Sequence, residues 1–208
     1  DQNVGMVLGS SPLGNSFSFW GRVIRMDSIG LDAIMMSTAI SGSTFTASGR
    51  NLAIRKKTFY DIDGYNAIRQ FTSGDDDLLM HLISKSRWKI VPCLTKGSEV
   101  ESPAPASLGE FVRQRLRFAS KGKAYYQLGF VSPLFRLGLV LIFATNLAAL
   151  YGQLYFFIQQ ELQWLFPWFI KIASDGLLIT AYLSQIGKKF DLPYFLFNEI
   201  WHALYVTL

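Results

Sequence analysis

The chain has few charged residues, one cysteine and two histidines. Charged residues make up 17% of its 208 residues, whereas about 25% is usual for a soluble domain. The single cysteine, Cys93, excludes an intrachain disulfide and a cysteine metal cluster. His81 and His202 are too few for a histidine metal centre, which normally needs three or more convergent ligands. The composition therefore excludes a disulfide scaffold and argues against a metal domain built on cysteine or histidine.

Nucleotide-binding and targeting signals are also missing. Neither G-x-G-x-x-G nor a P-loop pattern occurs. The opening Asp1-Gln2-Asn3 lacks the basic region of a signal peptide, and the first apolar run is short. The first residue is not Met. We therefore expect the chain to begin inside a longer protein.

The deficit of charge lies in the C-terminal third of the chain. Leu137–Ile158 contains no charged residue, and Leu162–Ile186 contains only Lys171 and Asp175. Roughly 20 apolar residues span a bilayer core, so both stretches are predicted to be transmembrane helices. A buried soluble helix pair is the alternative, although both runs exceed the usual length of a core helix.

Basic residues flank these two stretches, and the net charge of the chain is +5. The flanking residues are Arg113, Arg115, Arg117, Lys121, Lys123, Arg136, Lys188 and Lys189. The connector Gln159–Glu161 has no Lys or Arg. By the positive-inside rule both flanks are cytoplasmic and the connector lies outside. The basic charge therefore indicates membrane orientation and not nucleic-acid binding.

The part before the apolar stretches alternates short strands with helices. Hydrophobic periodicity and turn residues predict each of these elements. The predicted strands are Val4–Leu8, Leu52–Ile54, Trp88–Leu94 and Gly97–Glu101, and the predicted helices are Phe17–Ile40, a turn at Lys57–Tyr60, Asp75–Ser86 and Leu108–Leu128. The last helix is basic and aromatic, which suits a membrane surface.

Three consecutive carboxylates, Asp75, Asp76 and Asp77, open one predicted helix. Acids at a helix start often act only as caps and dipole partners, and Ser73 before Asp76 is close to a capping pattern. Three in a row exceed what capping needs, and like-charge repulsion should raise the pKa of one carboxyl, which suits a general base. The cluster is a candidate catalytic site.

A second acidic pair, Asp61 and Asp63, has the D-x-D spacing that binds a divalent metal and a nucleotide diphosphate. It stands at a turn before Gly64 instead of after a long apolar strand. We therefore do not assign it to a metal.

A polar run on the basic helix is the second candidate site. Arg113 and Arg117 lie one turn apart and share a face, while Arg115 points away. A positive-inside flank accounts for the charges alone. It does not account for Gln114 three residues before Arg117, followed by the aromatic Phe118.

These motifs together resemble family-2 glycosyltransferases, most closely the membrane-integrated group that includes cellulose, chitin and hyaluronan synthases. The similarity covers about residues 4–125, and the helices that follow resemble the membrane anchor of that group. The motifs that carry it are Gly49-Arg50-Asn51-Leu52-Ala53-Ile54-Arg55-Lys56, Phe59, Asp63-Gly64-Tyr65, Gly74-Asp75-Asp76-Asp77-Leu78 and Gln114-Arg115-Leu116-Arg117-Phe118.

The resemblance implies a GT-A fold that transfers a sugar from a nucleotide-diphosphate donor to an acceptor hydroxyl with inversion. It assigns the catalytic base to Asp75 or Asp76. Gln114 and Arg117 match the family's Gln-x-x-Arg-Trp motif, where Arg117 would stabilise the leaving diphosphate. Phe118 replaces the usual Trp and keeps a stacking face without the indole N–H. The substrate-binding residues are then Gly49, Asn51, Asp77, Gln114, Arg115, Arg117 and Phe118.

The resemblance also implies parts that would precede Asp1. These are the nucleotide-binding half and the metal-binding D-x-D, so we expect no metal site in this chain and a divalent Mg or Mn ion in the full-length protein. The expected fold class is α/β, as the C-terminal half of a GT-A domain before an α-helical transmembrane region. Its expected divisions are a partial catalytic domain at 1–106, an interface helix at 107–130 and transmembrane helices in 131–208, at about 134–158 and 162–186, with a candidate third from 192.

The expected partners are a nucleotide-diphosphate sugar, a saccharide or lipid acceptor, and membrane lipids. The expected location is the cell membrane, multi-pass, with the catalytic part on the cytoplasmic face of a bacterial inner membrane. The alternative is a small non-catalytic membrane protein, a transporter or scaffold, that uses Lys171 and Asp175 as an intramembrane pair. An i, i+4 pair can also simply neutralise itself within its helix.

Overall fold

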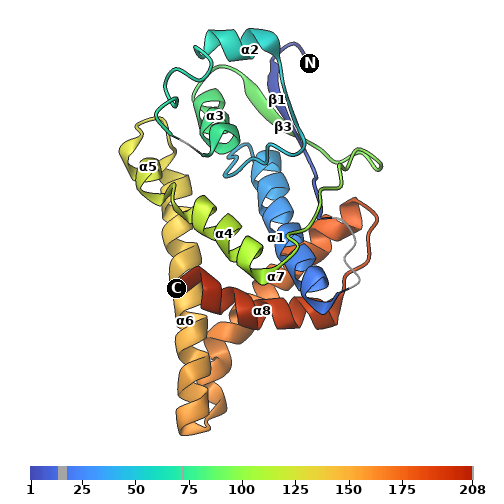
Figure 1. The fold of residues 1–208 in the computed structure, drawn as a ribbon, viewed down its shortest axis with the longest axis vertical. Helices are drawn as coiled ribbons and strands as arrows, with labels where there is room; N and C mark the ends of the chain where they lie inside the picture. Colours follow the sequence, from blue (N-terminus) through green and yellow to red (C-terminus); the bar gives the residue numbers. More distant parts are fainter. Residues whose placement is uncertain (14–17, 72, 208) are drawn as a thin grey trace.

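A three-stranded sheet lies at one end of the molecule, and helices make up most of the rest (Figure 1). The structure is a computed structural model, and it describes residues 1–13, 18–71 and 73–207. The predicted α/β class is confirmed. Three of the four predicted strands form, with small shifts at their ends: β1 (Val4–Gly9), β2 (Leu52–Ile54) and β3 (Lys89–Cys93).

β1 is the central strand, and it is paired on both sides. It runs antiparallel to β2, with Val7 opposite Ala53, and parallel to β3, with Val7 opposite Val91. Met6 and Leu8 of β1 are fully buried, which explains why this strand reads as a nearly continuous apolar run. A parallel pair needs a long crossover, and the chain between β1 and β3 supplies it as helices.

Most helices begin and end close to their predicted bounds. Phe17, predicted to begin the first helix, and Leu208, at the end of the last apolar stretch, lie outside the described residues. The helices are α1 (Phe19–Ile40), α2 (Lys56–Asp61), α3 (Asp75–Ser84), α4 (Leu108–Ala119), α5 (Gly122–Gln127), α6 (Pro133–Gln159), a short 3-10 helix η1 (Leu162–Leu165), α7 (Phe166–Gln185) and α8 (Leu192–Thr207).

The start of α3 differs from the predicted cap. The N-cap residue is Gly74, with φ of 86°, and no side chain caps this end. A left-handed backbone favours glycine, and a Cβ at Gly74 would also overlap with the Lys121 side chain. The capping prediction for Ser73 is therefore wrong. The Asp76 carboxylate accepts from the Asp77 N–H at 2.8 Å, and all three aspartates stand in the first turn, at the positive end of the helix dipole.

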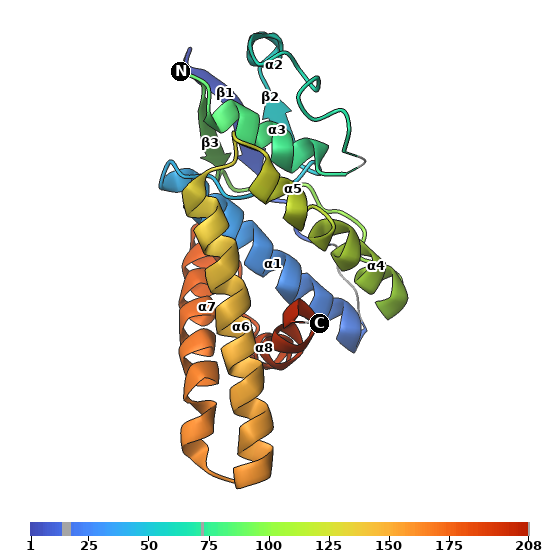
Figure 2. The same cartoon turned by 90° about the vertical axis from the view of Figure 1, so that its left-hand side faces the viewer.

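Two other predictions for the globular part are wrong. Residues 97–101 form a turn and an extended segment instead of a strand, tied to the loop after β1 by the Val100 N–H donating to the Ser10 carbonyl at 3.1 Å. The basic helix predicted over 108–128 is broken at Ser120 and Lys121 into α4 and α5. The break lets α5 turn toward α3, and this places Tyr125 against the acidic cluster (Figure 2).

α6 and α7 lie side by side and extend away from the sheet (Figure 2). Ser132 caps α6 by accepting from the Leu134 N–H at 3.2 Å, and Gln160 ends it in a left-handed conformation. Gly152 allows the connector to approach closely, because a Cβ there would collide with the Trp164 carbonyl. Within the described residues, α6 is the one helix long and apolar enough to cross a membrane.

The second and third predicted spans lack that support. α7 begins at Phe166, four residues later than predicted, because Leu162–Leu165 forms the 3-10 helix. α8 has 16 residues, fewer than the roughly 20 that span a bilayer, and it lies across the α6–α7 pair (Figures 1 and 2). A multi-pass arrangement therefore stays a prediction.

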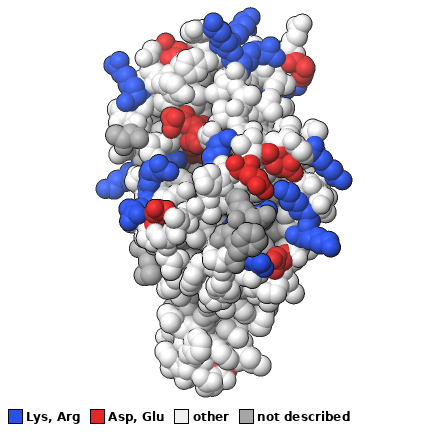
Figure 3. Space-filling view, turned by 45° about the vertical axis from the view of Figure 1, so that its right-hand side comes forward, with Lys and Arg blue, Asp and Glu red and all other residues white. Residues whose placement is uncertain are grey.

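The main core joins the sheet to the C-terminal helices. α1 packs against β3 on one side and against α7 and α8 on the other. One apolar cluster contains Met6 and Leu8 of β1, Met36 of α1, Leu78 of α3 and Leu183 of α7. Charged side chains surround the sheet end, and the far end of the α6–α7 pair is almost free of them on the face shown in Figure 3.

Candidate functional site

The three aspartates at the start of α3 have three different environments. Asp77 is buried, and its carboxylate accepts from Thr46 Oγ1 at 2.9 Å, from the Ala47 N–H at 3.1 Å and from the Tyr125 hydroxyl. These bonds fix the loop after α1 and helix α5 against α3. The hydrogen bonds of the Asp77 carboxylate therefore hold neighbouring parts of the chain together, and this indicates a structural role for Asp77.

Asp76 is half-buried and faces the loop before β2. Its Oδ2 accepts from the Gly49 N–H at 2.7 Å, and its Oδ1 accepts from the Asp77 N–H at 2.8 Å. Two backbone donors hold the carboxylate in one orientation and leave further lone pairs for another ligand. Asp75 is exposed, and its carboxylate has no hydrogen bond or ion pair to the part of the chain that is described. The geometry therefore favours Asp76 over Asp75 as a positioned base.

The loop that faces Asp76 is held by Asn51. Its Nδ2 donates to the carbonyl of Ser10 at 2.8 Å and to that of Ser98 at 3.0 Å. Gly9 leaves room for this amide, since a Cβ at Gly9 would overlap with it. A Cβ at Gly49 would lie 3.3 Å from Asp76 Oδ2, so glycine permits the short contact. Gly49 and Asn51, both predicted at the acceptor side, thus shape the wall opposite Asp76.

Two cations lie near the acids, and sequence reasoning assigned neither to the site. The Lys121 side chain passes over Gly74, the residue before Asp75. Arg50 donates from Nε to Ser48 Oγ at 3.1 Å. Burial lowers the pKa of Arg50, and the nearby carboxylates of Asp32 and Asp76 oppose that shift. Lys121 was indistinguishable from a positive-inside flank in the sequence, and Arg50 stood inside a motif already attributed to the acceptor loop.

Asp32 on α1 is a buried acid that the sequence analysis did not single out. Its Oδ2 accepts from Ser10 Oγ at 3.1 Å and from the Ser11 N–H at 3.0 Å. Burial raises the pKa of this carboxyl, and the two serine hydrogen bonds partly oppose the shift. Its position on the same helix face as Ile29 and Met36, three residues before it and four after it, was the signal that could have identified it. Asp32 fixes the loop after β1 against α1.

The predicted polar run on α4 divides into an inward and an outward part. Arg115 forms an ion pair with Asp27 of α1, and its guanidinium lies 4.8 Å from the Phe111 ring and 5.5 Å from the Phe118 ring. It points away from the outer face of the helix, as the sequence predicted. Gln114 is half-buried. This inward part fastens α4 to α1.

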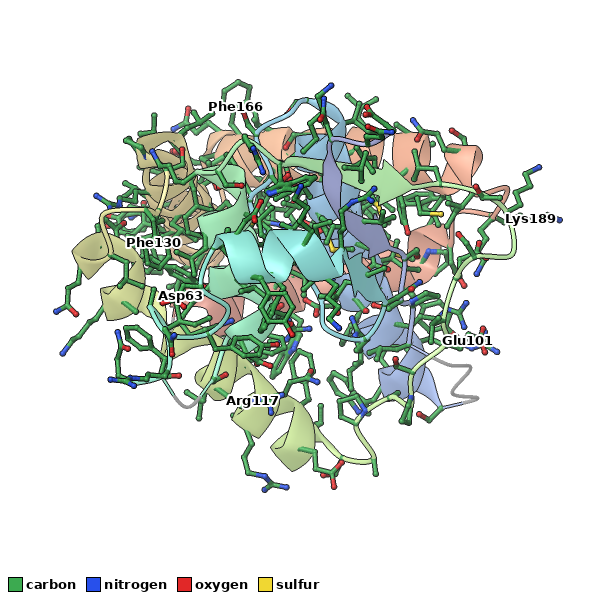
Figure 4. The ribbon with its side chains drawn as sticks, turned by 90° about the horizontal axis from the view of Figure 1, so that it is seen from above. Asp63, Glu101, Arg117, Phe130, Phe166 and Lys189 are labelled. Atoms are coloured by element: carbon green, nitrogen blue, oxygen red, sulfur yellow. The ribbon has the colours of Figure 1, made fainter. Side chains whose placement is uncertain are left out.

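Arg117 is exposed on α4, and Figure 4 shows it on the lower side of the molecule in the view from above. Its guanidinium lies 5.7 Å from the Phe118 ring, and Lys121 Nζ lies 5.7 Å from the same ring. No carboxylate pairs with Arg117 within the described ranges. Arg117 and Lys121 are therefore cations available to an anionic ligand on the side of α4–α5 that faces solvent.

The second acidic pair, Asp61 and Asp63, serves the local fold. Asp61 Oδ2 accepts from Arg87 at 2.9 Å and from Trp88 Nε1 at 3.1 Å. The hydrogen bond from Arg87 holds the pKa of this carboxyl below its usual value. Asp63 adopts a left-handed conformation at the end of α2. In the described residues no group of three or more His, Cys, Asp or Glu side chains is arranged to hold a metal ion.

Comparison with known proteins does not assign the chain to a family. No protein-family model matches it, and a search of curated proteins returned no match.

His81 on α3 provides a pH test of the packing beneath the site. It is fully buried, and neither ring nitrogen has a hydrogen-bond partner in the described parts of the chain. Its ring contacts those of Tyr125 and Phe135, with centroids 5.9 Å and 4.6 Å away. Burial lowers its pKa from the usual 6.5, and the Asp77 carboxylate partly opposes the shift, so the folded protein binds a proton on this ring less readily than the unfolded chain does.

As the pH falls through 6.5, His81 therefore binds a proton more readily in the unfolded chain than in the folded protein. His81 thus costs stability as the pH falls, with a slope of at most about 1.4 kcal/mol per pH unit, the limit for one proton. His81→Phe is expected to remove this part of the slope in unfolding measurements between pH 7.5 and 5. Equal slopes for the two proteins would show that His81 is not held neutral in the fold.

Proposed function

We propose that this chain carries the catalytic base and the acceptor side of an inverting glycosyltransferase. The observation that carries the proposal is Asp76. Two backbone N–H groups orient its carboxylate, a glycine loop lies opposite, and Lys121 and Arg50 supply positive charge nearby. This combination provides a proton acceptor beside cations suited to a diphosphate.

The proposed reaction uses these groups in one displacement. Asp76 takes the proton of an acceptor hydroxyl, and the hydroxyl oxygen attacks the anomeric carbon of the donor sugar. The bond from that carbon to the diphosphate oxygen breaks, and the nucleoside diphosphate leaves with the electron pair. Attack opposite the leaving group inverts the anomeric centre. Arg117 and Lys121 stabilise the negative charge on the leaving group.

Gln114 and Phe118 are proposed to contact the substrates from α4. Gln114 can hydrogen-bond to the acceptor or the diphosphate, and the Phe118 ring can stack on a sugar face. Arg115 and Asp77, predicted as substrate contacts, act in this proposal by holding α4 and α5 in position. A divalent metal would neutralise donor diphosphate charge, but the described residues do not form a site for it, so no step here depends on one.

The finer fold and location belong to the same proposal. The mixed sheet and α3 would form the acceptor half of a GT-A domain. The α6–α7 pair and the connecting helix η1 expose large apolar side chains, with Phe157 72%, Leu177 74% and Leu162 73% exposed. Apolar surfaces of this kind mark membrane or protein contacts. We propose that the pair enters the membrane and that basic α4 lies at its cytoplasmic surface.

Donor turnover tests the proposed function. The protein, at the length its gene encodes, is placed in lipid nanodiscs with Mg²⁺ or Mn²⁺ and a panel of uridine and guanosine diphosphate sugars. We expect release of nucleoside diphosphate from at least one donor, and a product with inverted anomeric configuration by NMR. A retained configuration, or no release from any donor, would contradict the proposal and favour the non-catalytic alternative built on Lys171 and Asp175.

Arg117 gives this experiment a matched pair of variants. Arg117→Ala is expected to lower kcat by about 100-fold, because a donor to the developing negative charge is lost. Arg113→Ala removes an exposed arginine one turn earlier on the same helix and is expected to change kcat less than threefold. Equal losses in the two variants would indicate a general effect of basic charge on membrane binding.

A further inference from the structure

A cavity of about 310 Å³ lies between α1, α6, α7 and α8, apart from the acidic cluster. These four helices come together below the sheet (Figures 1 and 2). The volume is at the lower end of the range of small-molecule sites. The proposed transfer reaction uses none of the residues that line it.

The floor of the cavity is polar and buried. Lys171 on α7 forms ion pairs with Asp175, at 2.7 Å, and with Glu199 on α8. His202 Nδ1 lies 2.9 Å from Asn146 Oδ1 on α6. Lys171, Glu199 and Asn146 are each at least nine-tenths buried. Burying polar and charged groups among apolar helices costs free energy of folding unless these groups are paired.

One group on this floor is unpaired. Asn198 is 3% exposed and lines the cavity, and its Oδ1 has no hydrogen-bond partner within the described chain. Leaving a buried acceptor unsatisfied costs free energy that a bound donor would recover. Asn198 therefore points to a ligand that donates a hydrogen bond.

The mouth of the cavity is apolar and open to the outside. Leu31, Ile142 and Ile170 line it and are 36%, 38% and 54% exposed. They come from α1, α6 and α7, so the opening faces sideways between these helices. A ligand that fills the whole site would have a polar head for the floor and an apolar tail for the mouth.

The charges on the floor select the kind of head. Two carboxylates face the single ammonium of Lys171, and a third lining carboxylate, Asp27, is paired with Arg115. A phosphate or another anion would therefore be repelled by the excess of negative charge. The carboxylate in excess is that of Asp175, whose side chain is 39% exposed, so the buried part of the floor, within the described chain, offers a cationic head no unpaired carboxylate. Hydroxyl groups both donate and accept, and they match a floor that offers carboxylate and amide acceptors beside an ammonium donor.

We propose that this cavity binds an amphiphile with an uncharged, polyhydroxylated head, such as a sugar carried on a single alkyl chain. The head contacts Asn198, Glu199 and Lys171, and the tail passes between Leu31 and Ile170. The proposal does not rest on transferase activity, since binding can be measured with no donor present.

The test uses radiolabelled octyl β-glucoside below its micellar concentration and the full chain in phosphatidylcholine nanodiscs. Binding is expected to be saturable and displaced by unlabelled octyl glucoside. Octyl phosphocholine, which has the same tail and a charged head, is expected to compete at least tenfold less well. Equal competition by the two would overturn the assignment of the head.

Free glucose distinguishes a lipid-linked sugar from a soluble one. It lacks the tail and is expected to compete at least tenfold more weakly than octyl glucoside. Competition by glucose at the same concentration would overturn the amphiphile and assign the site to a soluble sugar.

Gly30 on α1 supplies a variant that fills the cavity with little risk to folding. It lines the cavity, and among the described residues a Cβ there would come within 4 Å of Ile179 alone, at an ordinary contact distance of 3.8 Å. Gly30→Leu is expected to weaken octyl glucoside binding at least tenfold without lowering Tm. The control is Gly122→Leu on α5, where a Cβ would have no neighbour within 4 Å among the described residues, and its binding should be unchanged.

Asn198→Leu tests the polar floor itself. It removes the unpaired acceptor and keeps the number and branching of the side-chain heavy atoms, so affinity is expected to fall about fivefold while the protein stays folded. Unchanged affinity in both Gly30→Leu and Asn198→Leu would place the binding outside this cavity and overturn the proposal.

Discussion

Changing Asp76 to Asn is expected to lower the rate of sugar transfer by about 100- to 10,000-fold, the usual contribution of a general base. The amide cannot take the proton of the acceptor hydroxyl. Its oxygen can still accept from the Gly49 N–H, as Asp76 Oδ2 does at 2.7 Å, and the variant loses the one bond that Oδ1 accepts from the Asp77 N–H, so the fold should be kept. The measurement is kcat at saturating donor and acceptor, with Tm as the check on folding.

Asp75→Asn is the matched control, because it makes the same chemical change one residue earlier. Asp75 is exposed and its carboxylate forms no hydrogen bond or ion pair within the described chain, so kcat is expected to fall less than tenfold. A large loss in Asp75→Asn with an active Asp76→Asn would move the base to Asp75. Full activity in both variants would remove the base from this cluster.

Changing Lys171 to Met is expected to lower the free energy of unfolding by about 3–5 kcal/mol, the usual cost of removing one partner of a buried ion pair. The Lys171 and Glu199 side chains are 5% and 3% exposed, so Glu199 would be left buried without its cation. Asp175, at 39%, can turn to solvent. The effect is measured from unfolding midpoints in detergent, followed by circular dichroism.

The double variant Lys171→Met with Glu199→Leu separates the charge from the packing. Replacing both partners by apolar groups removes the unpaired acid, so most of the lost stability should return. Lys189→Met is the control for loss of a lysine, since Lys189 is exposed at the right-hand margin of Figure 4. A loss in the double variant as large as in Lys171→Met would show that the pair contributes nothing as a pair.

The local elements of the fold were largely predictable because their signals are local. The apolar run of β1, the helical spacing of α1 and the acidic start of α3 each predict their element from a few neighbouring residues. The break between α4 and α5 was not predictable in this way. It depends on the Tyr125 hydroxyl reaching Asp77, 48 residues away in sequence.

The sequence predicted which residues make up the candidate site, but it did not predict which role each of them has. Three adjacent aspartates look alike in the sequence, but α3 presents them at different angles, so Asp77 is buried, Asp76 meets the Gly49 loop and Asp75 faces solvent. Likewise, nothing near Arg115 in sequence indicates Asp27, its partner 88 residues away. Burial and long-range pairing decide these roles, and both follow only from the tertiary structure.

The packing of α1 affects how the chain can be divided. Its buried face, which includes Ala33 and Met36, belongs to the same apolar cluster as Ile179 and Leu183 of α7, and the Tyr182 hydroxyl donates to Ser10 Oγ at 2.6 Å in the loop after β1. The sheet end and the C-terminal helices thus share one cooperative folding unit. A chain cut before Pro133 would lose the cover of its own core, and it would aggregate instead of giving a water-soluble catalytic half.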